Sequence, residues 1–297
     1  MIVIRLMGGL GNQMFIYAFG KSLSKKIAHT ILFDTSSFVT GKREFELPLF
    51  PNIKLDIATM FQSLTAQGFD KEGAAQRLRN KKYGNSDNDN FFVIEEDRCD
   101  PEFLSSIDNG YCSGYFQDER YFLSVRDELL NDFSFVPFAA GDAYNNSLQE
   151  KILRCANPVA VHIRRGDYLA FNYPLCSLSY YNAAAKYILD RFSDAAFFVF
   201  GEDEEWINEK FKIDCKFKFV YLQAKGAGAD MQLMTMCRHH IIANSSYSWW
   251  GAWLPVYPQK IVIAPDNFDM NQVCANWVCL PAGPVPLTAK DKNAKRS

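Results

Sequence analysis

The sequence predicts an α/β fold in two domains, and three observations lead to it. In the second half, short apolar strands without polar alternation are separated by helical segments, which is typical of a parallel sheet covered by helices on both faces. At the N-terminus a strand, a glycine turn, a helix and a second strand follow one another, as they do at the start of a nucleotide-binding α/β half. The length of 297 residues suits two compact domains or one large one.

The first half opens with an apolar run that ends in glycines, a pattern that predicts a strand followed by a tight turn. Asn12 is a residue type favoured at helix N-caps, and aromatic residues recur at helical spacing after it. In order, we expect a strand at 3–7, a helix from Asn12 to 26, a strand at 29–34, an exposed loop or insertion at 71–90, a strand at 91–96 and a helix that follows residues 114–117 and ends near 131.

The second half begins after a turn-rich stretch at 137–146, whose composition is typical of a domain boundary. We therefore expect one domain at 1–140, a second at 147–281 and a frayed tail at 282–297. In the second domain we expect strands at 159–164, 197–201, 217–222, 240–243 and 260–264, alternating with helices at 178–191, 203–211, 230–237 and 246–254.

Composition excludes several classes of protein. The formal net charge is −2, whereas proteins that bind nucleic acid usually carry a basic excess. No stretch approaches the ~20 apolar residues of a transmembrane segment, and the N-terminus lacks the basic region of a signal peptide. The eight cysteines include no CxxC pair, so we expect reduced, mostly buried thiols. These features predict a cytoplasmic protein, either free or peripheral at the inner face of the membrane.

Residues 8–13 (GGLGNQ) form the first segment that could carry chemistry. Glycines at a strand-to-helix turn let a ligand approach the backbone and expose helix amides to an anion, so Gly9 and Gly11 are candidate donor-binding positions. Met14 replaces the third glycine of the dinucleotide fingerprint, although Asp34 ends the second strand at about the right distance. A nicotinamide enzyme and a tight turn without a ligand both stay open as alternatives.

Residues 162–168 (HIRRGDY) form the second segment. A histidine and two arginines at the end of a buried strand cost free energy of desolvation unless an anion binds beside them. His162 and Arg164 point to the same side of the strand and should face one ligand together, while Arg165 follows directly. Guanidinium groups match phosphate in bidentate geometry, which indicates a diphosphate leaving group. The alternative is a structural arginine–aspartate network with Asp167.

The third segment follows the strand predicted at 240–243. Asn244, Ser245 and Ser246 can cap a helix and present hydroxyl and amide groups to phosphate. Three tryptophans come directly after them. They could stack on a sugar or a base, but such a cluster is more often part of an inter-domain core.

The fourth segment is acidic and ends the strand predicted at 197–201. Glu202 or Asp203 could accept hydrogen bonds from the N1–H and the exocyclic amine of guanine, and a solvated helix start is the alternative. A metal-dependent transferase would place Asp-x-Asp after an apolar strand. The candidates are 87–89, which lies in the polar loop, and 203–205, which is an imperfect match. We therefore expect no metal site.

Five segments in matching order resemble glycosyltransferase family 11, the α-1,2-fucosyltransferases, and the bacterial members in particular. The resemblance covers about residues 1–280 and rests on GGLGNQMFxYA at 8–18, GYFQDERYF at 114–122, HIRRGDY at 162–168, DMxLM at 230–234 and ANSSYSWWGAWL at 243–254.

The resemblance implies a GT-B-like architecture, with two Rossmann-like domains and a cleft between them. The N-terminal domain would serve the acceptor and the C-terminal domain would bind GDP-L-fucose. The reaction implied is inverting transfer of fucose to the 2-hydroxyl of a terminal galactose on an oligosaccharide, possible without a metal or cofactor. The acceptor would be a galactose-terminated glycan, free or lipid-linked, of a lipopolysaccharide or capsule.

The resemblance also implies roles for individual residues. Arg164 would contact the β-phosphate, and the small polar residues 244–246 would contact the diphosphate. The carboxylate that contacts guanine would be Glu202 or Asp203, because the sequence here departs from the Ser-Asp-Asp of many relatives. Asn12 matches an asparagine that protein O-fucosyltransferases place near the reacting centre.

The residues do not identify a general base. Asp167 is the nearest candidate in sequence, with orientation of Arg165 as its alternative role, and a loose transition state with weak base assistance is a further possibility. A nicotinamide-dependent enzyme and a non-catalytic carbohydrate-binding protein remain as alternative functions.

Overall fold

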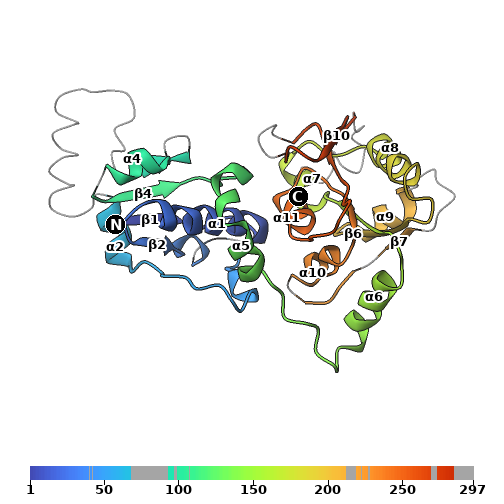
Figure 1. Cartoon of the computed structure of the whole chain (residues 1–297), viewed down its shortest axis with the longest axis horizontal. Helices are drawn as coiled ribbons and strands as arrows, with labels where there is room; N and C mark the ends of the chain where they lie inside the picture. The colour runs from blue at the N-terminus through green and yellow to red at the C-terminus, as the bar shows by residue number, and fades with distance from the viewer. Residues whose placement is uncertain are drawn as a thin grey trace. The chain divides into compact units, whose positions relative to one another are not determined.

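The computed structural model divides into two compact units, which we call unit 1 (Met1–Ser134) and unit 2 (Phe135–Ser297). Figure 1 draws unit 1 from blue to green and unit 2 from green to red. The loop predicted at 71–90, the 87–89 match and most of the predicted tail lie outside the described residues. The structure describes residues 1–39, 41, 43–67, 93–96, 99–106, 108–211, 219–221, 223–226, 228–268 and 273–283.

Unit 1 contains a four-stranded sheet in the order β2-β1-β4-β3, with every pair parallel. Its first strand is the apolar run IVIR, whose first three residues are buried. Helix α1 follows and buries most of its residues, because apolar side chains recur along it at helical spacing. The strands are β1 (Ile2–Arg5), β2 (Ile31–Asp34), β3 (Val93–Glu95) and β4 (Gly110–Ser113), and the α-helices are α1 (Leu10–Lys26), α2 (Met60–Ala66), α4 (Pro101–Ser105) and α5 (Arg126–Asp132).

Two expectations for unit 1 are wrong. Helix α1 begins at Leu10 with Gly9 as its N-cap, so Asn12 lies inside the first turn. The single helix expected after residues 114–117 is instead two 3₁₀ turns, Glu119–Tyr121 and Leu123–Val125, followed by α5. Phe122 separates the turns with a φ of −134°, which is not helical.

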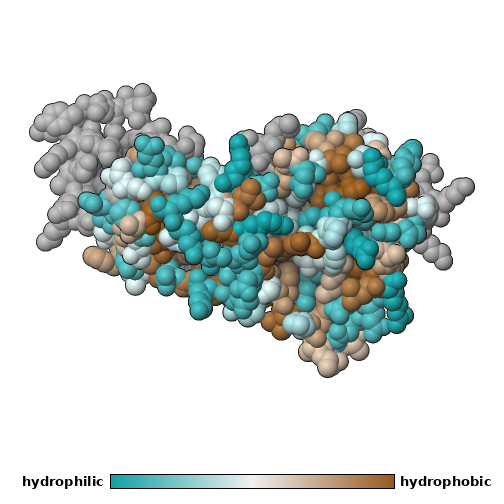
Figure 2. Space-filling model, in the orientation of Figure 1, coloured by the Kyte–Doolittle hydropathy of each residue, from teal (hydrophilic) through white to brown (hydrophobic). Residues whose placement is uncertain are grey.

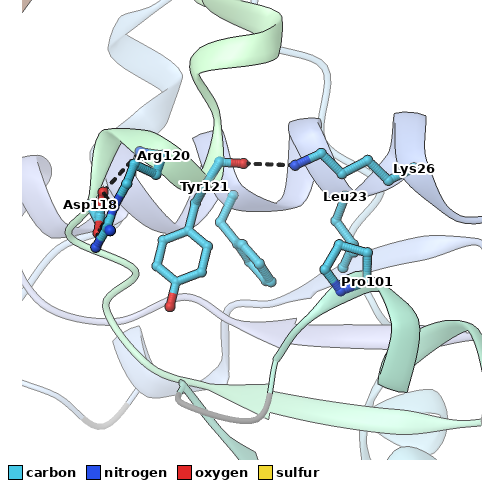
Figure 3. Close-up of a pocket in the computed structure, with 7 residues that line it drawn as sticks. Leu23, Lys26, Pro101, Asp118, Arg120 and Tyr121 are labelled. Atoms are coloured by element: carbon cyan, nitrogen blue, oxygen red, sulfur yellow. Dashed lines mark hydrogen bonds and ion pairs between the residues drawn. The ribbon is translucent and has the colours of Figure 1, made fainter.

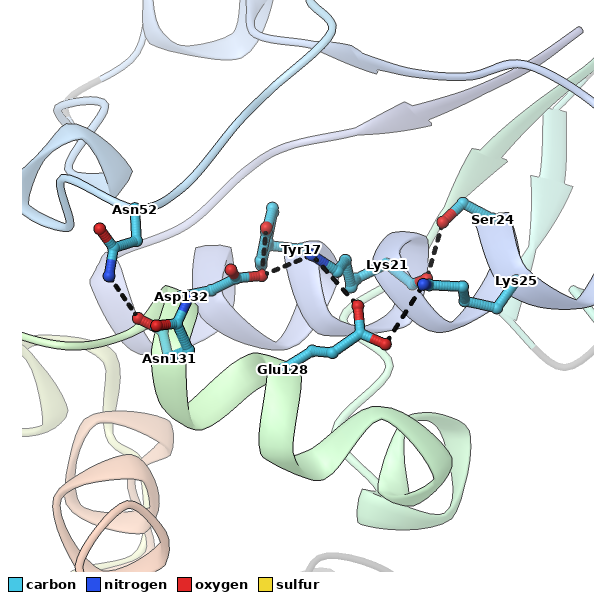
Figure 4. A network of polar contacts seen from close by, with 8 residues as sticks. All are labelled: Tyr17, Lys21, Ser24, Lys25, Asn52, Glu128, Asn131 and Asp132. Carbon is cyan, nitrogen blue, oxygen red and sulfur yellow. Dashed lines mark hydrogen bonds and ion pairs between the residues drawn. The ribbon is translucent and has the colours of Figure 1, made fainter.

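A polar network joins α1 to α5 in unit 1 (Figure 4). The hydroxyl of Tyr17 donates to Asp132 at 2.7 Å, and Lys21 Nζ donates to the same carboxylate oxygen at 2.9 Å. Lys25 pairs with Glu128 at 3.3 Å. Burial and the neighbouring carboxylate raise the pKa of the Tyr17 phenol, so it remains a hydrogen-bond donor and holds the two helices together.

Unit 2 contains a six-stranded sheet in the order β10-β9-β8-β5-β6-β7, again with every pair parallel. The strands are β5 (Pro158–Ile163), β6 (Ala196–Gly201), β7 (Phe219–Tyr221), β8 (His239–Ile241), β9 (Val262–Pro265) and β10 (Val278–Leu280), and the helices are α6 (Ala143–Leu153), α7 (Gly166–Phe171), α8 (Leu178–Leu189), α9 (Glu204–Lys210), α10 (Ala229–Thr235) and α11 (Ser246–Trp253).

Helices cover both faces of the sheet in unit 2. Val159 and Val161 of β5 share one buried cluster with Tyr181 and Ile188 of α8. Ala160, whose side chain points the other way, belongs to a second cluster with residues of α6 and α10. Both faces are therefore buried, which explains the unalternating strands. The predicted fold class, an α/β chain with two Rossmann-like domains that are each built on a parallel sheet, is confirmed.

The visible surface carries hydrophilic residues over most of its area, with smaller hydrophobic patches among them (Figure 2). None of the helices that the structure describes combines the length and apolar character needed to span a bilayer.

Candidate functional site

The sheet of unit 2 has a topological switch point between β5 and β8. From β5 the chain adds β6 and β7 on one side, and it then returns to add β8, β9 and β10 on the other. The loops after β5 and β8 therefore diverge, and the crevice outside the carboxyl ends of such strands is where open α/β sheets bind ligands. Three of the predicted segments follow β5, β6 and β8, which are adjacent strands.

Arg164 follows β5 and reaches across to the loop after β6. Its Nη1 donates to Glu202 Oε1 at 2.6 Å, and the two side chains are 15% and 60% exposed. Gly166 makes this approach possible, because a Cβ at that position would lie 2.1 Å from Glu202 Oε2. The predicted phosphate ligand and one predicted guanine ligand are thus paired with each other.

Arg165 is more deeply placed than Arg164. Its Nε donates to Asp203 Oδ2 at 3.0 Å, and its guanidinium lies 4.2 Å from the centre of the Trp206 ring. The Arg165 side chain is 7% exposed. The other oxygen of Asp203 accepts from the Trp206 backbone N–H at 3.2 Å and so caps α9.

Two carboxylates are thus paired with the arginines, Glu202 with Arg164 and Asp203 with Arg165. The acidic turn forms these ion pairs besides starting α9. Asp167 lies in the first turn of α7, and its side chain is outside the described part of the chain.

His162 lies on β5, and its side chain is buried against α11. Its Nδ1 is hydrogen-bonded to the hydroxyl of Ser248. Burial, and secondarily the charge of Arg164, lower the pKa of His162 to about 3. The imidazole is therefore neutral at physiological pH. It fixes α11 against β5 and brings no positive charge to an anion.

The loop after β8 leads into α11 and is tied to the loop after β5. The hydroxyl of Tyr168 in α7 donates to the backbone carbonyl of Asn244 at 2.6 Å. The Asn244 amide donates to the Pro174 carbonyl at 2.9 Å, whereas its Oδ1 is buried without a hydrogen-bond partner among the described residues. Ser245 is the N-cap of α11, yet its hydroxyl makes no capping hydrogen bond. Ser246 is the first residue of the helix.

The three tryptophans of α11 belong to the core of unit 2. Trp249, Trp250 and Trp253 are at most 4% exposed, and their ring centres lie 4.9–5.7 Å apart. A stacking role toward a sugar or base is wrong for rings so fully buried, and their burial places them in the core instead.

Unit 1 also has a switch point, between β1 and β4. Gly8 follows β1 with a φ of +78°, a conformation that favours glycine. Asn12 on α1 accepts a hydrogen bond from Gln117, which follows β4, at 2.7 Å. Gly9 and Gly11 lie at the N-cap and in the first turn of α1. The first two family-like segments therefore meet at this switch point.

Asp34 does not behave as a ribose ligand would. It is buried, and its two oxygens accept from the Tyr111 hydroxyl at 2.6 Å and from the Ser36 backbone N–H at 2.9 Å. The carboxylate thus links β4 to β2 across β1 and leaves the nicotinamide alternative without its acidic residue.

Unit 1 contains a cavity of about 370 Å³ that none of the predicted site residues lines (Figure 3). Phe19 and Lys26 belong to it, and they lie toward the far end of α1 from Asn12. The remaining lining residues are Leu23, Pro101, Asp118, Arg120 and Tyr121.

Several residues at the candidate site were not predicted from the sequence. Trp206 and Tyr168 pack against or bridge the predicted ligands, and Gln117 bonds Asn12. Asp230 of α10 accepts from the Ala224 backbone N–H at 2.8 Å, and burial raises its pKa to about 6, with a smaller contribution from the charge of Glu202. Gln117 and Asp230 lie inside two of the segments that resemble the family. That position was the feature of the sequence from which they could have been predicted.

Comparison with known proteins identifies the family. The family described as Glycosyl transferase family 11 matches residues 1–278. An alpha-1,2-colitosyltransferase of Escherichia coli is 32% identical over 89% of this chain and 91% of its own length. The O-antigen biosynthesis glycosyltransferase WbnK of Escherichia coli is 32% identical over 88% and 92%. The galactoside alpha-(1,2)-fucosyltransferase 1 of Saimiri boliviensis boliviensis is 25% identical over 83% of this chain and 63% of its own length. This chain belongs to glycosyltransferase family 11.

Proposed function

We propose that this glycosyltransferase moves L-fucose from GDP-L-fucose to the 2-hydroxyl of a terminal galactose, with inversion and without a metal. Two of the relatives carry the 1,2 linkage in their names, and one of these is a galactoside fucosyltransferase. A third relative is named for O-antigen biosynthesis, which supports a lipid-linked glycan as acceptor. Such an acceptor would place the enzyme at the cytoplasmic face of the membrane.

The observation that carries the donor proposal is the arginine pair at the β5/β8 switch point. The departing GDP carries negative charge that develops as the sugar leaves, and pre-positioned cations are the strongest single means of stabilising it. Arg164 and Arg165 are fixed in place by carboxylate partners before any donor binds. On the opposite side of the switch point, the first turn of α11 adds backbone N–H groups and the hydroxyls of Ser245 and Ser246.

Unit 1 supplies the remaining predicted residues. We propose that Asn12, held by Gln117, orients groups at the reacting centre, because its side chain is fixed at the first turn of α1. Gly9 and Gly11 let a ligand approach that turn. Asp167 stays a candidate for orienting Arg165 through its position in α7.

The colitosyl relative favours a second donor. A colitosyl unit is a fucosyl unit without the 3-hydroxyl, so one site can accept both only if it makes no essential contact to that group. A site built around the 3-hydroxyl would reject the deoxy donor strongly, since its polar partner would be left unpaired.

The experiment is a donor and acceptor panel with product analysis. We expect transfer from GDP-fucose to a β-galactoside, with a new α-1,2 linkage by NMR, and none to the matched 2-deoxygalactoside. Transfer from the 3-deoxy donor at a much higher kcat/KM would assign the colitosyl function instead. A product that forms equally well on the 2-deoxy acceptor would refute the linkage.

Chelation is expected to leave this transfer largely intact. Among the described residues, no three His, Cys, Asp or Glu side chains are grouped as a metal site would require, and the proposal gives the arginines the role of neutralising the diphosphate. The measurement is the initial rate after exhaustive dialysis against EDTA. Loss of activity that Mg²⁺ or Mn²⁺ restores would overturn the metal-free mechanism.

A further inference from the structure

Three aromatic side chains gather at the end of α7, shortly after the arginine pair. The ring centre of Tyr173 lies 5.2 Å from that of Tyr168 and 6.1 Å from that of Phe171. Phe171 and Tyr173 are 67% and 56% exposed. We call these three residues the aromatic turn. Single exposed apolar side chains are ordinary on a protein surface, whereas adjacent ones are typical of a binding surface.

The backbone fixes the aromatic turn in place. Asn172 ends α7 in the left-handed region, with a φ of +59°, a conformation that asparagine adopts more readily than most residues. The chain therefore reverses, and the Tyr173 N–H donates to the Tyr168 carbonyl at 2.9 Å. Asn244 holds both ends of the turn, because its carbonyl accepts from the Tyr168 hydroxyl and its amide donates to the Pro174 carbonyl. A surface that the protein itself orders loses little conformational entropy when it binds a ligand.

The aromatic turn adjoins the arginine of the proposed phosphate site. The guanidinium carbon of Arg164 lies 5.5 Å from the centre of the Tyr168 ring. Arg164 donates to Glu202 after β6, whereas the Tyr168 hydroxyl donates to the loop after β8. Because β5 lies between β6 and β8 in the sheet, the acidic turn lies on one side of Arg164 and the aromatic turn is tied to the loop on the other. All of these residues belong to unit 2.

The covalent order of a nucleotide sugar fits this arrangement. Its diphosphate joins the nucleoside at one end to the sugar at the other. With guanine on the acidic turn and the β-phosphate on Arg164, the sugar is directed toward the β8 side of the sheet. Since the sugar is bonded directly to the β-phosphate, the Tyr168 ring beside Arg164 is within its reach.

The two candidate donor sugars share one apolar substituent, the 6-methyl group. Fucose is a 6-deoxyhexose, and the colitosyl unit differs from it only at the 3-position. A methyl group gains free energy when it leaves water for an apolar surface, whereas the hydroxyl that L-galactose carries there must give up hydrogen bonds to water. The exposed rings of Phe171 and Tyr173 offer apolar surface of this kind.

We infer that the aromatic turn binds the sugar of the nucleotide donor and selects 6-deoxy sugars through their methyl group. The inference rests on the proposed function and adds to it the surface that sets donor specificity. Tyr168 contacts the sugar ring next to the phosphate, and Phe171 and Tyr173 contact the methyl group.

The test compares GDP-L-fucose with GDP-L-galactose, which differs from it only by a 6-hydroxyl. We expect wild type to prefer GDP-L-fucose by about 10–100-fold in kcat/KM and in affinity, the order by which an apolar site discriminates one small group. Phe171→Ala and Tyr173→Ala should each lower this preference several-fold, and the double variant should nearly abolish it. Tyr173→Phe should keep it, because the ring remains.

The matched control is Phe61→Ala, because Phe61 lies on α2 of unit 1 and is 74% exposed. This variant should keep the wild-type preference. All the variants change exposed side chains, so the melting temperature and the affinity for GDP should stay at their wild-type values.

Other occupants of the aromatic turn give different results. Weaker binding of GDP in the alanine variants would place the base against the rings, and a raised KM for the galactoside with the donor preference intact would place the acceptor there. Either result would overturn the inference, as would equal affinity of wild type for the two donors. The affinities are measured by calorimetry without acceptor, so they do not depend on transfer. A preference that depends on the rings, in a protein that transfers fucose to no galactoside, would overturn the proposed function and support the inference.

Discussion

Replacement of Arg164 by lysine is expected to lower kcat by about 10²–10³-fold while the protein folds normally, the usual cost of losing one donor to a developing negative charge. Lysine keeps the positive charge but lacks the planar guanidinium of arginine. It therefore cannot bind Glu202 through one nitrogen and also donate two parallel hydrogen bonds to phosphate. The ion pair in the free protein engages Nη1 of Arg164 with an exposed carboxylate, 60% accessible, that a diphosphate can displace.

The measurement is steady-state transfer from GDP-fucose, with GDP affinity by calorimetry and a thermal melt. The matched control is Arg154→Lys, because Arg154 is 79% exposed and pairs with Glu150 at 2.9 Å on a helix surface. The Arg154→Lys variant should keep the wild-type kcat, GDP affinity and melting temperature. If the kcat of Arg164→Lys lies within a few-fold of the wild-type value, Arg164 does not stabilise the leaving group.

Glu202→Gln is expected to abolish most of the preference for GDP over ADP, whereas Asp203→Asn should keep it. Guanine offers two adjacent donors, N1–H and the 2-amino group, to one carboxylate, and adenine lacks the pair. Both oxygens of Asp203 are already engaged, by the Trp206 N–H and by Arg165. Glu202 is the more exposed carboxylate, and among the described residues its side chain is hydrogen-bonded to Arg164 alone. It can therefore turn to the base when phosphate replaces it.

The expected loss of selectivity is about 2–4 kcal/mol, the order of cost for a charged partner left unsatisfied. Inhibition constants for GDP and ADP in wild type and both variants measure it directly. Loss of selectivity in Asp203→Asn alone would assign the base contact to Asp203. Full selectivity in both variants would place guanine recognition elsewhere.

The sheet of unit 2 was predictable because strands buried on both faces are short continuous apolar runs. All five strands expected there exist, with ends shifted by one or two residues where the structure describes them. Several of the elements that escaped prediction are weak in local signal. Strand β4 (GYCS) is short and contains glycine, β10 has three partly exposed residues, and α7 lies within a segment that reads as a binding motif.

The sequence indicated the candidate site residues as strand-end positions, but it did not indicate which of them pair. Strand ends and glycine turns are local patterns, so they located residues 164–165, 202–203 and 244–246 in the sequence. The ion pair of Arg164 with Glu202 joins residues on neighbouring strands, and no local pattern specifies which carboxylate an arginine reaches. Helix α1 starts before Asn12, because Gly9 is extended and the first turn forms over Leu10 and Gly11. The N-cap preference of asparagine did not reveal this start, which depends on the backbone.

The position of the two switch points has a consequence for folding. Strand β1 pairs on one edge with the nearby residues 31–34 and on the other with the distant residues 110–112. Likewise β5 pairs on one edge with β6 and on the other with β8, which starts at His239. Contacts between residues far apart in the chain close large loops and form slowly. In each unit we therefore expect the strand pair that carries the candidate site residues to form after the neighbouring pairs. Until β4 joins β1, or β8 joins β5, the half-sheet of that unit keeps an open central edge.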